Sequence, residues 1–589
     1  MCRLRGSGRC QLRTGLAASG AQTWCLTDMS GASGRRGAGK RPGSATTPPS
    51  GRRGGADQRS PSTPGSRAQR PGSAGRPGSG RPGTGRPGPD QVRRTACEVL
   101  IAVSGNDAYA NLLLSASLRE RGLRGQDAAL ATELVYGTLR NRSCYDAVIS
   151  MCADRDLDQI DPPVLAVLRL GTHQLLGMRI KAHAAVATTV DLAVAIAGRR
   201  PAGFVNAVLR RIAPRELESW IELVAPDRAT DLAGHLSTRY SHPRWIVEAL
   251  AAALGESAPG LPQTVPGDGL TAPGQTRAEA GLAQAKPGLP QAERGLPQAD
   301  RGLPRTEAAL AADQDRPAVT LAAVPGLASR DELVTAGAEA ARWSPFGAYL
   351  DHGDPGAISA VAEGRAAVQD EASQLAVLAL TRAAAEGRDR FWLDLCAGPG
   401  GKARLLAGIA AERGASLVAA DLHEHRARLA AGALSGTGTA RVISADGTAP
   451  AWRPGAFDRV LADVPCSGLG SLRRRPEARW RRDPADIAAL GELQRALLDS
   501  AVEATRPGGV VAYVTCSPHL AETRDILDDV LRRRQDIAVL DCPALLAEVP
   551  DLRCRQPYSR YAQFWPHRHG TDAIFIALLR RTGADSLPA

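Results

Sequence analysis

The sequence lacks the features of a secreted, membrane-spanning or zinc-binding protein. Its 11 cysteines are spread over 589 residues without any Cys-x-x-Cys pair, so neither a dense disulfide framework nor a cysteine zinc site is predicted. No apolar run approaches the about 20 residues that are needed to cross a bilayer. The N-terminal residues contain no run that resembles the apolar core of a signal peptide. These absences predict a cytoplasmic protein without a metal site or membrane contact.

Excess positive charge is also missing from most of the chain. The net charge is +12, but residues 1–90 hold 16 basic and 3 acidic side chains, while the remainder holds 57 and 58. This Gly/Pro/Ser/Arg-rich segment cannot bury enough apolar surface to offset its ordering entropy, so a disordered tail is predicted. The tail is either simply solvated or attracts RNA weakly. Any basic surface elsewhere must be a local cluster.

Apolar periodicity divides the rest of the chain into four parts. Residues 91–250 have helical spacing and short loops, which predict a helical bundle. Residues 255–316 repeat Gly-Leu-Pro or Gly-Leu-Ala every seven residues, and because Gly and Pro forbid a continuous coiled coil, a flexible insertion is predicted. Residues 317–385 form a small subdomain, and residues 386–582 alternate strands with helices, as α/β sheets do.

The last region contains several apolar segments of strand length. Those predicted as strands are Phe391–Leu395, Ser416–Ala420, Ala440–Ile443, Phe457–Leu461, Val510–Val514 and Ala573–Leu578. Their alternation with helical stretches indicates a mostly parallel sheet that is covered by helices on both faces. Ligands of such sheets bind beyond the carboxyl ends of the strands, and the turns that follow the strands are therefore where functional residues are expected.

A glycine-rich turn follows the first of these strands and precedes a helix. Its residues are Cys396, Ala397, Gly398, Pro399, Gly400, Gly401 and Lys402. Glycines here let the backbone approach a ligand, and the helix N-terminus offers free amides. The mononucleotide motif fails at Cys396 and Ala403, and the dinucleotide motif fails at Ala403. S-adenosylmethionine (SAM) remains as the predicted ligand, and a glycine turn without any ligand is the alternative.

Two aspartates follow the next two strands. Asp421 ends the second strand, 23 residues past Gly398, where a carboxylate would accept hydrogen bonds from ribose hydroxyls. Asp446 follows the third strand and either meets the adenine or is an ordinary loop aspartate before Gly447. Both are predicted SAM ligands, with that alternative left open for Asp446.

Two cysteines and an aspartate follow later strands of the same sheet. Asp463 and Cys466 lie just after one strand and Cys516 just after the next, so all three are predicted at the ligand edge. A thiolate that adds to carbon 6 of cytosine turns the ring into an enamine, whose carbon 5 can attack the SAM methyl group. Asp463 is placed to hydrogen bond to ring nitrogen 3, and the base must leave any stack to enter.

A single cysteine is more often a small buried hydrophobe than a nucleophile. That interpretation applies to Cys97, Cys144, Cys152, Cys396, Cys542 and Cys554. An arginine-rich run follows the turn that holds Cys466, and its members suit phosphate contacts and base stacking. The residues predicted to contact RNA are Arg473, Arg474, Arg475, Arg479, Trp480 and Arg481. A solvated charged face is the alternative.

These motifs resemble the RsmB/Fmu (Sun) family of bacterial 16S ribosomal RNA cytosine-5 methyltransferases, in the NOL1/NOP2/Sun group. The similarity covers about residues 91–580. Cys396–Lys402 resembles the SAM loop of the family, Asp463–Gly468 its Asp-x-Pro-Cys-Ser motif, and Thr515–Ser517 its nucleophile motif. The segment Val368–Ser373 resembles the stretch ahead of the SAM loop.

The helical region resembles the RNA-binding NusB fold, most clearly at Gly203–Arg211. This stretch adds Arg210 and Arg211 to the predicted RNA contacts and favours a ribosomal RNA substrate over transfer RNA. The fold implied is an all-α NusB-like domain followed by a Rossmann-like α/β class I SAM methyltransferase domain. Residues 317–325 lack the Arg-x-Asn pattern of the family, so the small RNA-contacting subdomain is expected to differ.

The resemblance also implies roles for individual residues. Cys516 would be the nucleophile, and Cys466 would assist release of the methylated product. Asp463 would contact the cytosine and the cofactor region, and Lys402 would lie near the target base or hold Asp463. The chain would act as a monomer on small-subunit ribosomal RNA. The competing hypothesis is a non-catalytic RNA-binding or antitermination factor, which would bind RNA but not SAM.

Overall fold

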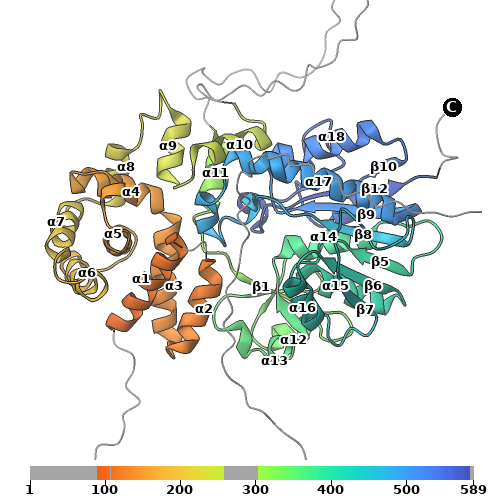
Figure 1. Cartoon of the computed structure of the whole chain (residues 1–589), viewed down its shortest axis with the longest axis horizontal. Helices are drawn as coiled ribbons and strands as arrows, with labels where there is room; N and C mark the ends of the chain where they lie inside the picture. Colours follow the sequence, from red (N-terminus) through yellow and green to blue (C-terminus); the bar gives the residue numbers. More distant parts are fainter. Residues whose placement is uncertain (1–88, 106–107, 258–302, 584–589) are drawn as a thin grey trace, which may run out of the picture. The chain divides into compact units, whose positions relative to one another are not determined.

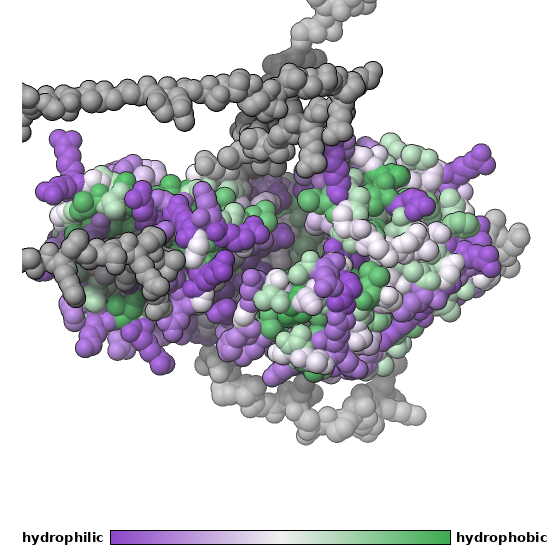
Figure 2. Space-filling model, turned by 90° about the horizontal axis from the view of Figure 1, so that it is seen from below, coloured by the Kyte–Doolittle hydropathy of each residue, from purple (hydrophilic) through white to green (hydrophobic). Residues whose placement is uncertain are grey.

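The computed structural model describes residues 89–105, 108–257 and 303–583 (Figure 1). Residues 1–88 of the predicted tail and residues 258–302 of the predicted insertion lie outside these ranges, and the last two tail residues begin helix α1 (Pro89–Gly105). Within them, no helix is long and apolar enough to span a membrane. Figure 2 shows one face of the molecule, on which hydrophilic residues alternate with smaller hydrophobic patches.

The first described part of the chain is helical, as predicted. Its helices are α1 (Pro89–Gly105), α2 (Ala110–Glu120), α3 (Gly125–Arg140), α4 (Arg142–Ala153), α5 (Pro162–Leu176), α6 (Ala182–Ala197), α7 (Ala202–Ile212), α8 (Leu217–Val224), α9 (Leu232–Arg239) and α10 (Arg244–Leu254). One face of α1 is buried in a core shared with α3, α5, α6 and α7. This face carries Val92, Ala96, Val99, Leu100 and Val103, the spacing that places apolar side chains on one side of a helix.

The structure corrects the end of the predicted flexible insertion. Its last part forms helix α11 (Pro304–Ala312), and Leu303 and Leu310 are buried against α9 and α10. The carboxylate of Glu256 accepts hydrogen bonds from the Arg305 and Thr306 amides and from the Thr306 hydroxyl at 2.7–3.0 Å. This helix is not predicted from the sequence because Pro304, within the repeat, resembles a helix breaker. Proline is favourable in the first turn of a helix.

A small antiparallel sheet follows α11, with the strand order β2-β3-β1-β4. Its strands are β1 (Val319–Ala323), β2 (Glu339–Ala340), β3 (Gly347–Leu350) and β4 (Ala366–Val368), with helices α12 (Arg330–Thr335) and α13 (Ser359–Ala362) between them. Helix α14 (Glu371–Arg382) then leads into the main sheet. The small sheet thus occupies the region in which a subdomain is predicted.

In the described chain the main sheet has eight strands, in the order β10-β12-β9-β8-β5-β6-β7, with β11 beside β12. They are β5 (Phe391–Asp394), β6 (Ser416–Asp421), β7 (Ala440–Ser444), β8 (Phe457–Asp463), β9 (Thr505–Thr515), β10 (Ile537–Leu540), β11 (Ala562–Gln563) and β12 (Phe575–Arg581). The strands from β9 to β7 are parallel to one another, whereas β12 pairs antiparallel with both β9 and β10. All six predicted strands are present.

Helices cover both faces of this sheet (Figure 1). The helices after α14 are α15 (Gly401–Glu412), α16 (Glu424–Ala433), α17 (Pro484–Ala504), α18 (Arg524–Arg533) and α19 (Pro566–His569). Val510, Ala512 and Val514 pack with α14 and α15, whereas Val511 and Tyr513 pack with α17 and α18. Successive residues of β9 therefore enter opposite cores, which explains its continuous apolar sequence.

A buried arginine links the α/β part to the helical part. Arg479 lies in a short 3-10 helix and is fully buried. Its guanidinium donates hydrogen bonds to the carbonyl oxygens of Arg140 at 2.8 Å, Ser241 at 3.2 Å and Asp313 at 2.9 Å. Burial lowers the pKa of Arg479 to about 10, so the side chain is still a cation at neutral pH. One side chain therefore holds three segments that are far apart in the sequence.

The Arg479→Met variant is expected to destabilise the protein by about 3 kcal/mol, because it leaves three buried carbonyl oxygens without their donor. The thermal unfolding midpoint should fall by roughly 5 °C. Arg482→Met is the matched control, since Arg482 is exposed and its nearest carboxylate oxygen, on Asp486, is 4.0 Å away. Equal midpoints for the two variants would contradict this role of Arg479.

Candidate active site

The predicted SAM loop is a tight turn between β5 and α15. Gly398 and Gly400 have φ angles of +55° and +95°, which side chains rarely adopt. A Cβ on Gly400 would also lie 2.8 Å from the Cβ of Ala433 and 3.0 Å from the Cα of Ala430. Only glycine therefore allows α15 and α16 to approach each other here, with the first amides of α15 at the carboxyl edge of the sheet.

Asp421, at the end of β6, is bound directly to this turn. Its carboxylate accepts hydrogen bonds from the Gly398 amide at 3.0 Å and the His423 amide at 2.8 Å. Asp446 lies on the next loop and is exposed; it accepts hydrogen bonds from the Thr448 amide and hydroxyl at 2.8 and 2.7 Å, which lower its pKa. That pattern is the ordinary loop geometry left open above, and a SAM contact for Asp446 stays a prediction.

Lys402 and Asp463 form an ion pair at the centre of the edge. The Lys402 Nζ lies 2.8 Å from the Asp463 Oδ2, so of the two predicted positions for Lys402 this geometry is the one that holds Asp463. Burial disfavours the charged amine, but the Asp463 carboxylate outweighs it and raises the pKa of Lys402. Lys402 is therefore a cation within the site.

Asp394, the last residue of β5, is fully buried beside this pair. Among the described residues, neither of its carboxylate oxygens has a hydrogen-bond partner. Burial and the nearby Asp463 raise the pKa of Asp394 to about 8. Asp394 is therefore mostly protonated at neutral pH, and a positively charged ligand such as SAM, with its sulfonium and ammonium, would favour its carboxylate form beside Asp421 and the Lys402–Asp463 pair.

The two predicted cysteines meet directly beyond β8 and β9. The Sγ atoms of Cys466 and Cys516 are 3.2 Å apart, and both side chains are partly exposed. The Gly470 amide donates to the Cys516 carbonyl at 2.8 Å, and the Gly470 carbonyl accepts from the Ala573 amide at 2.7 Å. A Cβ on Gly470 would lie 1.9 Å from the Ala573 carbonyl oxygen, so glycine is required for this loop to pack beside Cys516.

The two thiols have opposite electrostatic environments. The hydrogen bond from Cys466 lowers the pKa of Cys516 against the opposing effects of burial and Asp463, and the positive charges of Lys402 and Arg475 lower it further. The pKa of Cys466 is raised well above its ordinary value by the same hydrogen bond and by burial. Cys516 is therefore the thiol that ionises more readily, with Cys466 as the partner that keeps its proton, which is the condition for a nucleophile.

For three of the arginines predicted to contact RNA, internal pairing corrects that prediction: Arg473 and Arg479 are buried, and Arg474 is partly exposed but paired. Arg473 and Arg474 each pair with Asp370 and Asp572 at 2.6–3.3 Å, and Arg479 binds the buried carbonyl oxygens described above. Charged groups in such positions are paired because an unpaired buried charge is costly. In this fold the three side chains hold segments together and present little surface to RNA.

The other members of the run lie closer to solvent. Arg475 is exposed, and the guanidinium carbons of Arg475 and Arg481 lie 5.7 and 5.1 Å from the ring centre of Tyr109. The Trp480 ring lies 5.6 Å from the Arg142 guanidinium. Nothing in the sequence marks Tyr109, because it precedes α2 in the helical part.

Arg210 and Arg211, at the end of α7, are exposed. Arg211 forms an ion pair with Asp154 and donates to the Cys152 carbonyl at 2.9 Å. Helix α7 packs on α4, α5 and α6, so the structure does not bring these two arginines together with the cysteine pair. Their contact with RNA remains a prediction.

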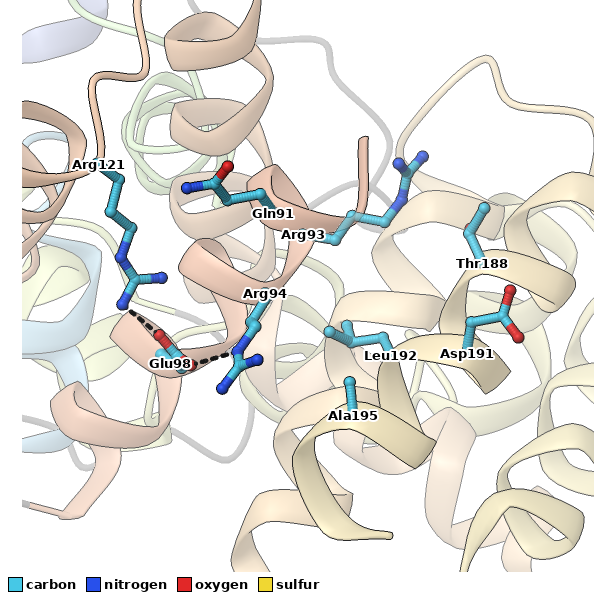
Figure 3. Close-up of a pocket in the computed structure, with 9 residues that line it drawn as sticks. All are labelled: Gln91, Arg93, Arg94, Glu98, Arg121, Thr188, Asp191, Leu192 and Ala195. Atoms are coloured by element: carbon cyan, nitrogen blue, oxygen red, sulfur yellow. Dashed lines mark hydrogen bonds and ion pairs between the residues drawn. The ribbon is translucent and has the colours of Figure 1, made fainter. Parts of the chain in front are cut away.

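A hollow of about 550 Å³ in the helical part contains none of these groups (Figure 3). It is lined by α1, by α6 and by Arg121. Glu98 forms ion pairs there with Arg94 at 2.8 Å and Arg121 at 2.5 Å, so part of its positive charge is neutralised within the protein. In the described ranges, no three side chains are grouped as ligands for a metal ion.

Comparison with known proteins identifies the family. The model of the 16S rRNA methyltransferase RsmB/F matches residues 381–580, and the NusB family model matches residues 90–214. Rv1407 of Mycobacterium tuberculosis, which carries the name of a methyltransferase, is 48% identical over 493 residues, or 84% of this chain and 97% of that protein. The ribosomal RNA small subunit methyltransferase B of Pseudomonas syringae pv. tomato is 30% identical, over 84% of this chain and 97% of that protein.

The chain belongs to the RsmB/F family. It is a SAM-dependent ribosomal RNA methyltransferase, which confirms the predicted enzyme class over a non-catalytic factor. The crystal structure of PH0851 is similar with a TM-score of 0.62 and 20% sequence identity, covering 84% of this chain and 100% of that chain. That likeness shows a shared fold, and together with the two family matches it confirms the predicted NusB-like helical domain and Rossmann-like methyltransferase domain.

The unequal thiols generate a prediction on their reactivity with pH. Alkylation of Cys516 by iodoacetamide, followed by mass spectrometry, should rise with a midpoint below the ordinary thiol pKa, because the hydrogen bond from Cys466 and two cations stabilise the thiolate. In Lys402→Met the midpoint should move to higher pH, since the variant removes a cation and leaves Asp463 unneutralised. Lys181→Met, on the exposed start of α6, should leave it in place. An unshifted midpoint in Lys402→Met would count against the electrostatic role of Lys402.

Proposed function

We propose that this protein methylates carbon 5 of a cytosine in 16S ribosomal RNA through a covalent bond between Cys516 and carbon 6. The observation that carries this proposal is the pair of unequal thiols, 3.2 Å apart, beside the glycine turn at the carboxyl edge of the sheet. Methylation of a nitrogen or oxygen atom needs no thiol, because those atoms are already nucleophilic. Carbon 5 of a pyrimidine becomes nucleophilic only when carbon 6 has been attacked.

The cofactor would be bound by the turn after β5 and by the strand ends around it. The first amides of α15, the Gly398–Gly401 backbone and the Asp421 carboxylate supply the polar contacts, and Asp446 remains a predicted contact to the adenine. The buried Asp394 carboxyl, without a partner among the described residues, suits a positively charged group. When bound, SAM supplies the methyl group.

Cys516 and Asp463 would act on the cytosine together. The Cys516 thiolate adds to carbon 6 while ring nitrogen 3 gains a proton, and Asp463 is the group predicted to face that nitrogen. Because Asp463 is a carboxylate paired with the Lys402 ammonium 2.8 Å away, the proton would pass from Lys402 through Asp463 to nitrogen 3. The addition leaves carbon 5 electron-rich and ready for methyl transfer.

Cys466 would act when the product is released. After methyl transfer a water molecule takes the proton from carbon 5, and the electron pair of that bond restores the double bond to carbon 6. The bond between carbon 6 and the Cys516 sulfur then breaks, and nitrogen 3 returns its proton through Asp463. The departing sulfur carries negative charge, which the Cys466 thiol stabilises by donating a hydrogen bond across 3.2 Å. The raised pKa of Cys466 keeps that proton in place.

The RNA would approach along the arginines that remain exposed. Arg475 lowers the pKa of Cys516, and its side chain, the exposed Tyr109 ring and Arg481 together offer positive charge and a stacking face. Phosphates and unstacked bases bind such surfaces. The NusB-like helical domain extends the surface available to ribosomal RNA.

The two cysteine variants should fail at different steps. Cys516→Ala should lose methylation by about 1000-fold or more, because no adduct forms. Cys466→Ala should form the adduct and release it slowly, so a covalent protein–RNA species should accumulate in denaturing gels when SAM and 16S ribosomal RNA are present. Bisulfite sequencing of the RNA locates the modified cytosine. Methylation by Cys516→Ala at the normal rate would disprove the covalent mechanism.

Asp421→Asn should weaken SAM binding by about 10-fold in calorimetry, because a neutral amide accepts the Gly398 and ribose hydrogen bonds less strongly than a carboxylate. Asp158→Asn is the control, since Asp158 is exposed in the helical part. The same affinity in both variants would show that Asp421 does not bind the cofactor.

A further inference from the structure

Glu522 is a buried carboxylate behind the two cysteine turns. It ends a short 3-10 helix, Leu520–Glu522, that follows β9, and it is fully buried. None of the ion pairs found between described residues involves Glu522. Burying a carboxylate without a cation destabilises the fold unless hydrogen bonds compensate. The groups that donate those hydrogen bonds therefore indicate which part of the structure Glu522 holds.

The Glu522 carboxylate holds both neighbours of Cys466. Its Oε1 accepts hydrogen bonds from the Ser467 amide at 2.7 Å and the Gln494 Nε2 at 3.1 Å, and its Oε2 accepts from the Ser467 hydroxyl at 2.5 Å. The same Gln494 amide also donates to the Pro465 carbonyl at 2.9 Å. The residues before and after Cys466 are therefore fixed through one carboxylate.

The same residue is attached to the strand that carries Cys516. The Glu522 carbonyl accepts a hydrogen bond from the Tyr513 hydroxyl of β9 at 2.8 Å. Each cysteine is followed by a serine, and the hydroxyl oxygens of these serines, Ser467 and Ser517, are 3.1 Å apart. Glu522 thus connects the turn of Cys466 to the turn of Cys516.

We propose that Glu522 is the positioning residue of the thiol pair: it holds the Cys466 sulfur at hydrogen-bonding distance from the Cys516 sulfur and keeps Cys466 as the donor. This role rests on the proposed function of the two cysteines. Glu522 acts through Ser467 and Gln494.

The charge of Glu522 serves the same end as its hydrogen bonds. The pKa of Cys466 is raised by its hydrogen bond to Cys516, by burial, and by the negative charges of Cys516 and Glu522. Other titratable groups around Cys466 and Glu522 are Tyr513 and His519. A neutral residue in place of Glu522 would make it easier for Cys466 to lose the proton that it shares with Cys516.

The test is the isosteric variant Glu522→Gln, which can still accept the Ser467 amide but carries no charge. We expect kcat to fall by about 10-fold with KM for RNA and SAM unchanged, because the thiols are misaligned while the binding surfaces remain. The alkylation midpoint of Cys466 should also move to lower pH. If the carboxylate were merely structural, Glu522→Gln would neither lower kcat at constant KM nor shift the alkylation midpoint of Cys466.

Glu256→Gln is the matched control. Its carboxylate likewise holds the chain by hydrogen bonds, from two backbone amides and one hydroxyl at 2.7–3.0 Å, and it also pairs with the partly exposed Arg305 side chain at 3.0 Å, away from the cysteines. It should lose comparable thermal stability and keep its kcat. Ser467→Ala serves if Glu522→Gln does not fold, because it removes only the hydroxyl contact; it should lower kcat by a few-fold at constant KM.

Wild-type kcat and an unshifted Cys466 midpoint in Glu522→Gln, or wild-type kcat in Ser467→Ala, would overturn the positioning role. This result is distinguishable from failure of the proposed function. If the proposed function fails, Cys516→Ala still methylates RNA; if only the positioning role fails, Cys516→Ala is inactive and Glu522→Gln is normal.

Discussion

The parallel pairing of β8 with β9 is the constraint on which the active site depends. Its register sets Asp463 opposite Val514. The two strands therefore end at the same edge of the sheet, and the turns that follow them begin side by side. Because alternate residues of β9 are buried in two different cores, a slip of one residue would place every side chain in the wrong layer. Apolar packing far from the chemistry therefore determines the distance between the sulfurs.

Charge balance is the second requirement of this edge. Asp463 and an ionised Cys516 would repel each other if no cation stood near them, and Lys402 is that cation. The arrangement makes the two cysteines unequal although both follow parallel strands in similar turns. An assignment of nucleophile and donor thus follows from the surroundings of each sulfur, and it agrees with the roles that the family resemblance implies.

The arginine-rich run shows how one composition can serve two purposes. The side chains of Arg473, Arg474 and Arg479 bind internal carboxylates and carbonyl oxygens. Those of Arg475 and Arg481 lie against the exposed ring of Tyr109, which belongs to the helical part. Internal pairing holds the segment in place with Arg475 near Cys516. The exposed part of the run is therefore smaller than the run of positive charge suggests, and it lies against Tyr109 of the helical part.

Much of the fold and part of the site follow from local sequence. The strands, the glycine turn and the cysteines after β8 and β9 are predictable because alternation, helical spacing and turn chemistry act between near neighbours. The 3.2 Å sulfur distance, the burial of Arg479, helix α11 and the hold of Glu522 on Ser467 were decided only by the tertiary structure. Each depends on partners distant in sequence, which no local pattern specifies: the sequence determined which groups reach the edge, and the packing decided which of them meet.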